Sequence, residues 1–232
     1  MRHALFGFAL AAVLPCAAAL ADEAYNPAIN PADFSTTINN PLFTLPPGKL
    51  MVYETLTDEG PERVEIRIRN DVRKIMGVET LVYNDRVFVN NQLREETNDY
   101  LAQDGQGNVW YFGEAVDNYE NGAFKDHAGS WIAGENGALP GIWIKGKQVV
   151  GDRYRMEFFK GEAEDMAEVV AIGVTVKVTA GTFDNCTKVY EFSPLEANAK
   201  EHKYYCPDVG GQALSEHLVE KNRVELVQVG QD

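Results

Sequence analysis

The chain has 232 residues, of which 45% are hydrophobic, and its 35 acidic and 21 basic residues give a formal net charge of −14. This excess of negative charge argues against nucleic acids and anionic membrane surfaces as partners, because both would repel the protein. The length suits one domain or two small ones.

The first 21 residues have the pattern of a cleaved signal peptide. Arg2 precedes an apolar run over 4–20, and small residues stand before the expected cleavage point after Ala21. The run contains Pro15 and falls short of the roughly 20 apolar residues of a membrane helix, and no later segment is longer. We therefore expect a protein of the periplasm or a secreted protein, with no integral membrane segment after signal cleavage.

Residues 22–47 are rich in Asn, Pro and Thr and show no apolar period. Such a composition is typical of irregular chain. We expect an extended N-terminal leader that wraps the domain or stays loose, followed by a single β-domain over 48–232.

From Lys49 onward the pattern is typical of β-strands. Residues 63–69 alternate strictly between apolar and charged, as in a strand with one buried and one solvated face. Turn residues such as Asn90-Asn91 and Asn121-Gly122 separate the segments. We predict a mostly β fold, a single curved antiparallel sheet that forms a half-barrel or barrel. Its expected strands are 49–57, 62–69, 78–89, 93–103, 108–118, 153–160, 164–178, 182–192, 201–206 and 223–229.

Two segments outside these strands carry separate expectations. Residues 212–221 look amphipathic, with Leu214 and Leu218 four positions apart, and predict one short helix. Residues 126–148 hold two tryptophans and several glycines, and we expect a long irregular loop across one end of the sheet.

The densest polar segment is 154–170. Downstream of it, 170–178 alternates with apolar residues of one parity, which should face the core. Followed backwards without a break, that parity brings three glutamates to the core side: Glu162, Glu164 and Glu168. Buried carboxylates are costly unless they are paired, protonated or bound to a metal. A bulge at Gly161 would instead shift the parity and leave the glutamates on a solvated rim. Both interpretations remain open.

Two cysteines remain once the signal peptide is removed, Cys186 and Cys206. An isolated pair in an oxidising compartment usually forms a disulfide. If 182–192 and 201–206 pair as a hairpin, these cysteines lie opposite each other at a spacing that a disulfide tolerates. The same register predicts two further pairs, Lys188 with Tyr204 and Tyr190 with His202.

Histidine is scarce, and His202 lies in a predicted strand beside tyrosines. Such a histidine is either a hydrogen-bonded structural residue or a ligand. We expect the acidic segment 162–168 to lie within reach of His202, where its charge would raise the pKa of the imidazole.

Several segments resemble a recurrent pattern in a family of secreted bacterial proteins of unassigned function. They cover most of 38–210 and read Ile38-Asn39-Asn40-Pro41, Asn108-Val109-Trp110-Tyr111-Phe112-Gly113-Glu114, Lys160-Gly161-Glu162-Ala163-Glu164-Asp165 and His202-Lys203-Tyr204-Tyr205. The stretch from Tyr204 to Gly210 is also similar to the final strand of half-barrel envelope proteins related to lipoprotein carriers. The second resemblance implies a curved sheet that cups a ligand.

The favoured function is a non-catalytic exported protein that holds a small molecule in the concave face of the sheet. Such sites combine apolar walls with a few polar groups. The expected ligand-binding residues are Trp110, Tyr154, Met156, Phe158, Tyr190 and Tyr204.

Two alternatives remain. The first is metal binding, with Glu162, Glu164, Asp165, Glu168 and His202 as the expected ligands. Oxygen ligands suit calcium, and a histidine moves the preference towards copper or zinc. The second is an enzyme that uses a carboxylate and His202 for general acid–base chemistry.

Overall fold

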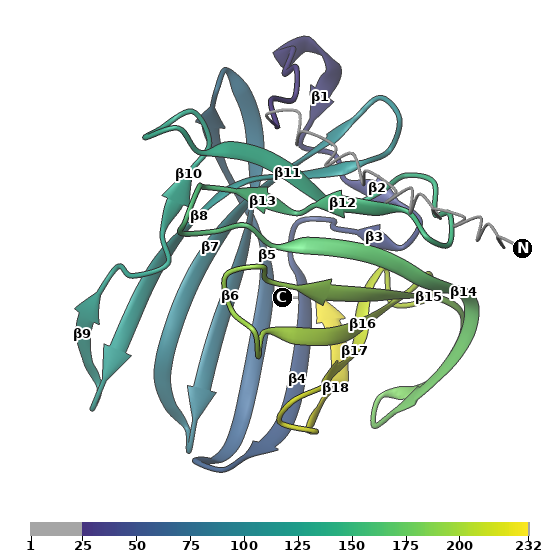
Figure 1. The fold of residues 1–232 in the computed structure, drawn as a ribbon. Helices are drawn as coiled ribbons and strands as arrows, with labels where there is room; N and C mark the ends of the chain where they lie inside the picture. The colour runs from purple at the N-terminus through teal and green to yellow at the C-terminus, as the bar shows by residue number, and fades with distance from the viewer. Residues whose placement is uncertain (1–24, 232) are drawn as a thin grey trace, which may run out of the picture.

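The computed structural model describes residues 25–231 and is built almost entirely of β-strands (Figure 1). Strands account for 65% of the described residues and helical residues for 1%, so the predicted mostly β fold is confirmed. Within the described part, no helix is long and apolar enough to cross a membrane. The expected signal peptide over 1–21 lies outside the described residues.

One antiparallel sheet of 13 strands forms the body of the molecule and is nearly closed into a barrel with one seam. The order across the sheet is β12-β14-β15-β16-β17-β18-β4-β5-β6-β7-β8-β11-β13. Its strands are β4 (Lys49–Thr57), β5 (Gly60–Ile75), β6 (Val78–Val89), β7 (Gln92–Asp104), β8 (Val109–Glu120), β11 (Leu139–Ile144), β12 (Arg153–Arg155), β13 (Glu157–Phe158), β14 (Met166–Val178), β15 (Gly181–Phe192), β16 (Lys200–Cys206), β17 (Gly211–His217) and β18 (Arg223–Gln231).

Short elements complete the fold. The 3-10 turn η1 (Pro31–Asp33) precedes β1 (Phe34–Ser35), which pairs with β7. The strands β9 (Ala123–Asp126) and β10 (Trp131–Ile132) pair with β8, while β2 (Asn39–Asn40) and β3 (Phe43–Thr44) pair with each other.

The seam lies between β12 and β13, which follow each other in the chain with Met156 between them. β12 pairs with β14, and β13 pairs with β11 at the other end of the sheet. Gly141 permits this crossing, since a Cβ there would lie 2.2 Å from the carbonyl oxygen of Met156. The backbone at Met156 therefore joins the two ends of the sheet covalently.

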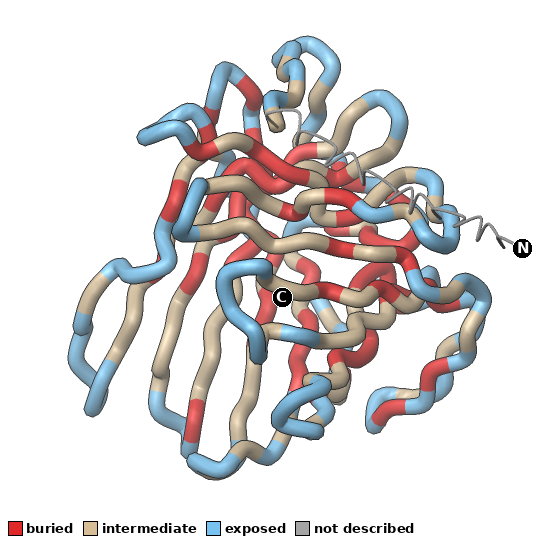
Figure 2. The backbone as a smooth tube through the Cα atoms, viewed as in Figure 1, coloured by how far each residue is buried: buried red, intermediate tan, exposed pale blue. Residues whose placement is uncertain are grey.

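The leader packs against the sheet. Ile38, Phe43 and Leu45 are buried in the main core, and β1 adds to the edge of β7. Buried chain gathers in the upper half of Figure 2, whereas the lower parts of the long strands are mostly intermediate or exposed. The buried core therefore lies towards one end of the barrel.

Two element predictions are wrong. Residues 211–217 form the strand β17 rather than a helix, because β16 and β18 on either side of it complete its backbone hydrogen bonds. The expected irregular loop over 126–148 contains β10 and β11, since both find a partner in β8.

The parity predicted for 170–178 is correct at Val176 and Val178, which are buried, but wrong at Val170 and Ile172. Val169 is fully buried, whereas Val170 and Ile172 are 39% and 49% exposed. The register of β14 against β15 shifts at three places, and Gly173 adopts a left-handed φ of 74° there. Because each bulge inserts a residue, the buried face moves to the other parity before it returns at Val176.

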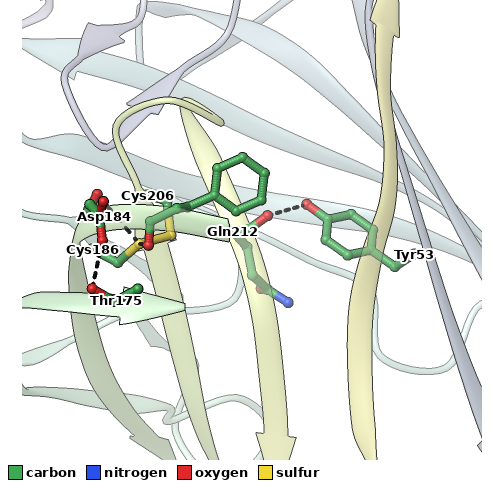
Figure 3. Close-up of a disulfide and its surroundings, with 7 residues drawn as sticks. Tyr53, Thr175, Asp184, Cys186, Cys206 and Gln212 are labelled. Carbon is green, nitrogen blue, oxygen red and sulfur yellow. Dashed lines mark hydrogen bonds between the residues drawn. A yellow bond between two sulfur atoms is a disulfide. The ribbon is translucent and has the colours of Figure 1, made fainter. Parts of the chain in front are cut away.

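The predicted disulfide joins β15 to β16 (Figure 3). The Cα atoms of Cys186 and Cys206 lie 4.2 Å apart. Nearby, the Tyr53 hydroxyl donates to the Gln212 carbonyl at 2.8 Å, which ties β4 to β17 (Figure 3). The predicted register is confirmed, with Lys188 opposite Tyr204 and Tyr190 opposite His202.

Candidate functional site

Polar side chains from the long strands share the inner face of the barrel. Across three neighbouring strands Tyr83 lies opposite Asp99, and Asp99 lies opposite Glu114. Directly opposed residues of a sheet project from the same face. Asp85 has the parity of Tyr83 and lies opposite Ile66, so it projects inward as well.

A cavity of about 230 Å³ lies inside the barrel and is lined by residues of β4, β5, β6, β11, β16, β17 and β18. We call it the inner cavity. Aromatic, aliphatic and charged side chains line it together, including Tyr53, Tyr83, Asp85, Trp143, Glu201 and Lys203. Its size falls just below the usual range of small-molecule sites, roughly 300–1,000 Å³.

A wider hollow of about 700 Å³ adjoins the inner cavity near the turn between β4 and β5. We call it the mouth. The two share Glu62 and His217 in their walls. Together their walls carry two basic residues, Arg94 and Lys203, against seven acidic ones: Asp58, Glu59, Glu62, Asp85, Glu95, Glu201 and Glu220.

Asp85 is the central carboxyl of the inner cavity. Its buried Oδ1 has no hydrogen-bond partner among the described residues. Burial, reinforced by the charge of Glu95, raises the pKa of Asp85 to about 7, although Lys203 acts in the opposite direction. The carboxyl of Asp85 is therefore about half protonated near neutral pH.

A second group of carboxyls lies along β7, β8 and β13. The Tyr111 hydroxyl donates to Asp99 Oδ1 at 2.6 Å. Burial raises the pKa of both Asp99 and Glu114, and it raises the pKa of Glu157 to about 8. The indole Nε1 of Trp131 lies near Glu114 and Glu157 but completes no hydrogen bond with them. Burial therefore favours the neutral form of these acids, and their neighbouring carboxyls act in the same direction.

The opposite wall binds its own cation. Lys203 Nζ lies 2.7 Å from Glu191 Oε2 and 3.3 Å from Glu201 Oε1. The Tyr205 hydroxyl donates to the other oxygen of Glu191 at 3.0 Å, and Ser215 donates to Glu201. Burial opposes the charge of Lys203, but the two glutamates outweigh it and hold its pKa well above the ordinary value.

Aromatic rings form one side of the inner cavity. Trp143 contacts Tyr83 at 5.7 Å between centroids and meets Tyr111 edge-on at 5.0 Å. Phe43 from the leader stacks on the ring of Trp143. Tyr83, Tyr111 and Trp143 thus form one group of contacting rings. The buried Nε1 of Trp143 has no hydrogen-bond partner among the described residues.

The six predicted ligand-binding residues are not brought together. Tyr154 and Met156 are buried, as expected for residues that face the interior. Trp110 donates its Nε1 to Asp104 at 2.8 Å beneath the leader, and Phe158 packs against Tyr25. Tyr190 and Tyr204 lie on the outer face, because a strand alternates its faces and their neighbours Glu191, Lys203 and Tyr205 point inward.

His202 also projects outward. It contacts the Tyr190 ring at 5.7 Å, on the face away from the inner cavity. Partial burial lowers the pKa of His202, and Lys188 lowers it further. The predicted rise in its pKa is therefore wrong, since the carboxylates of 162–168 do not surround the imidazole.

The predicted metal ligands do not converge. Glu168 pairs with Arg153 at 2.5 Å, and Glu164 accepts from the Gly161 amide at 2.8 Å. Gly161 and Glu162 are exposed in a turn before β14, which matches the solvated-rim interpretation. Within 25–231, no group of three or more His, Cys, Asp or Glu residues could hold a metal ion. The predicted metal ligands that the structure does not bring together are Glu162, Glu164, Asp165, Glu168 and His202.

Sequence reasoning missed Asp85 and Asp99. A usable signal was present, since Asp85 stands at the same parity as Tyr83, Val87 and Val89 in an otherwise apolar row. An acidic residue in a row of apolar residues that face the core is a candidate site residue, because a buried carboxylate is costly unless it is paired, protonated or bound to a metal.

Residues of the site thus come from strands that are far apart in sequence, and the barrel alone brings them together. Comparison of the chain with protein-family models, with curated protein sequences and with solved structures finds no match.

Proposed function

We propose that the chain is a non-catalytic binding protein that holds a small molecule in the inner cavity. The observation that carries the proposal is a pair of buried polar atoms without partners, Asp85 Oδ1 and Trp143 Nε1, whose side chains both line that cavity. A buried polar group left unpaired costs about 1–3 kcal/mol. A ligand that bonds to these atoms would remove part of this cost, and so would bind tightly for its size.

The walls support a preformed site. The inner cavity lies between strands held in continuous ladders, and the Cys186–Cys206 disulfide ties β15 to β16 beside it. The mouth provides a route to solvent past Glu62 and His217. Largely preformed, concave sites with apolar walls and a few polar groups are typical of small-molecule binding. A periplasmic or secreted location is part of the same proposal.

Native mass spectrometry of the protein purified from its own source tests the proposal. A retained small molecule is expected in the wild type and in Val72→Trp, whose side chain is exposed on β5. It should be lost in Val64→Trp, which fills the inner cavity from the same strand. Retention by Val64→Trp, or the lack of any retained or stabilising compound for the wild type, would contradict the proposal.

General acid–base catalysis at Asp85 is a second candidate function. It is supported by the pKa of about 7 of this carboxyl inside a cavity, because a group that titrates near the working pH is well suited to proton transfer. Conversion of the retained compound by the wild type but not by Asp85→Asn would favour catalysis over binding.

A further inference from the structure

The charge around the inner cavity and the mouth is strongly negative. Seven acidic residues face two basic ones in the combined walls. Lys203, the basic residue of the inner cavity, is already bound to Glu191 and Glu201. The remaining carboxyls of the inner cavity, Asp85 and Glu62, therefore form no ion pair with a lysine or arginine among the described residues that line it.

The unpartnered oxygen of Asp85 determines which kind of hydrogen-bonding group a ligand must supply. This buried Oδ1 lacks a hydrogen-bond partner among the described residues, and the ionised carboxylate, which predominates above pH 7, can only accept. A ligand that satisfies it must bring N–H or O–H groups, and one that also carries positive charge would make a shorter and stronger bond. Negative ligands are disfavoured, because Asp85 and Glu62 would repel them and the charge of Lys203 is already balanced by Glu191 and Glu201.

The aromatic lining favours an organic cation over a metal ion. Tyr53, Tyr83 and Trp143 line the inner cavity together with Asp85. Aromatic faces attract ammonium groups through the ring quadrupole and pack against alkyl carbon. Hard metal ions instead require several oxygen ligands around one point. No such group of acidic, His or Cys residues occurs in the described part of the chain.

We propose that the ligand of the inner cavity is a small protonated amine, whose ammonium group binds Asp85 beside the rings of Tyr53, Tyr83 and Trp143, with Glu62 adding negative charge farther along β5 towards the mouth. This inference rests on the proposed function and narrows it to one chemical class. The negative mouth attracts such a cation, and the raised pKa of Asp85 falls when the ammonium binds.

Three probes of similar size and different charge test whether the ligand is a protonated amine: benzylammonium, benzyl alcohol and benzoate. Binding is measured by isothermal titration calorimetry and by tryptophan fluorescence at pH 8, above the pKa of about 7 of Asp85. Benzylammonium should bind at least about tenfold more tightly than benzyl alcohol, and benzoate most weakly. Alkylammonium ions from methyl to butyl, tested in the same way, cover the case in which the benzyl ring is too large.

Variants of the cavity carboxyls test where the ammonium group binds. Asp85→Asn should weaken benzylammonium, or the best alkylammonium, about ten- to a hundredfold and leave benzyl alcohol unchanged. Glu62→Gln removes a more distant negative charge and should weaken the same ammonium by a smaller factor. Asp208→Asn is the matched control, since Asp208 is exposed in the turn after β16. Thermal unfolding of each variant verifies that it is folded.

The outcomes separate the two proposals. If benzyl alcohol or benzoate binds as tightly as the amines, and Val64→Trp abolishes that binding, the amine inference is overturned and the proposed function stands. If no ammonium probe binds, or if the affinity is equal in wild type and both carboxyl variants, the amine inference is likewise overturned. The native mass spectra then decide the proposed function independently.

Discussion

Asp85 and Lys203 line the same cavity from β6 and β16, yet Lys203 binds Glu191 and Glu201 rather than Asp85. The aspartate is therefore buried near a cation that is already committed elsewhere. Burial and the charge of Glu95 raise the pKa of Asp85 to about 7, and Lys203 lowers it only in part, while Asp85 Oδ1 has no hydrogen-bond partner among the described residues. The same relationship makes the interior sensitive to pH and to the loss of single charges.

The first prediction concerns stability and pH. Asp85 has a higher pKa folded than unfolded, so the folded state binds more protons between pH 3.8 and about 7. The free energy of unfolding should fall by up to about 4 kcal/mol on this account as pH rises through that window, and not further above it. Asp85→Asn should remove this part of the pH dependence.

Urea unfolding of both proteins from pH 4 to pH 9 measures the effect. The charged groups that act on Asp85 are Glu62 on β5, Glu95 on β7, Glu114 on β8 and Lys203 on β16. They are present in both proteins, so the difference between the two curves isolates Asp85. Parallel curves for wild type and variant would show that the carboxyl ionises as it does in water.

The second prediction concerns the ion pairs of Lys203. Lys203→Met leaves Glu191 and Glu201 buried without their cation, and the free energy of unfolding should fall by about 3–5 kcal/mol at neutral pH. Part of the loss should be recovered at acidic pH, where the glutamates become protonated. Lys147→Met, at an exposed loop position, should have little effect. A loss below about 1 kcal/mol for Lys203→Met would contradict the role given to this group.

The third prediction tests the crossing at the seam. In Gly141→Ala the new Cβ would lie 2.2 Å from the Met156 carbonyl oxygen, so β11 and β13 must separate. We expect a loss of several kcal/mol, comparable to overpacking or backbone displacement in a core. Gly105→Ala is the control, because no atom lies within 4 Å of its Cβ position. Equal melting temperatures for the two variants would show that the seam is not closed in this way.

The fourth prediction concerns the disulfide. Replacement of both Cys186 and Cys206 by Ala should lower the free energy of unfolding by about 2–4 kcal/mol, since the bridge constrains the unfolded chain. Reductant should destabilise the wild type by a similar amount and leave the double variant unchanged. A wild type that is insensitive to reductant, with two free thiols in a peptide map, would contradict the bridge.

Local patterns in the sequence determined the fold class and most of the strands. Residues 49–57 and 78–89 were predicted with the bounds that the structure has, because alternation and turn residues act over a few positions. The turns at Asn90-Asn91 and at Asn121 adopt the left-handed φ that asparagine tolerates. The hairpin register of Cys186 and Cys206 followed from their spacing.

The bulges of β14 and the strand β17 required the neighbouring strands. Residues 211–217 carry spacing that suits a helix, but β16 and β18 supply ladder partners on both sides. The face that Glu168 occupies depends on where β14 bulges against β15, and one inserted residue reverses it. Sequence alternation alone cannot locate that insertion, because it depends on the partner strand.

The candidate site was decided by the tertiary structure alone. Asp85 and Lys203 are 118 positions apart in the chain and meet only because the sheet curls until β12 and β13 join at Met156. Their burial, and the pKa shifts that follow from it, arise from the low polarity of a closed interior. A strand pattern states which residues share a face, whereas the curvature of the whole sheet decides which faces enclose a cavity.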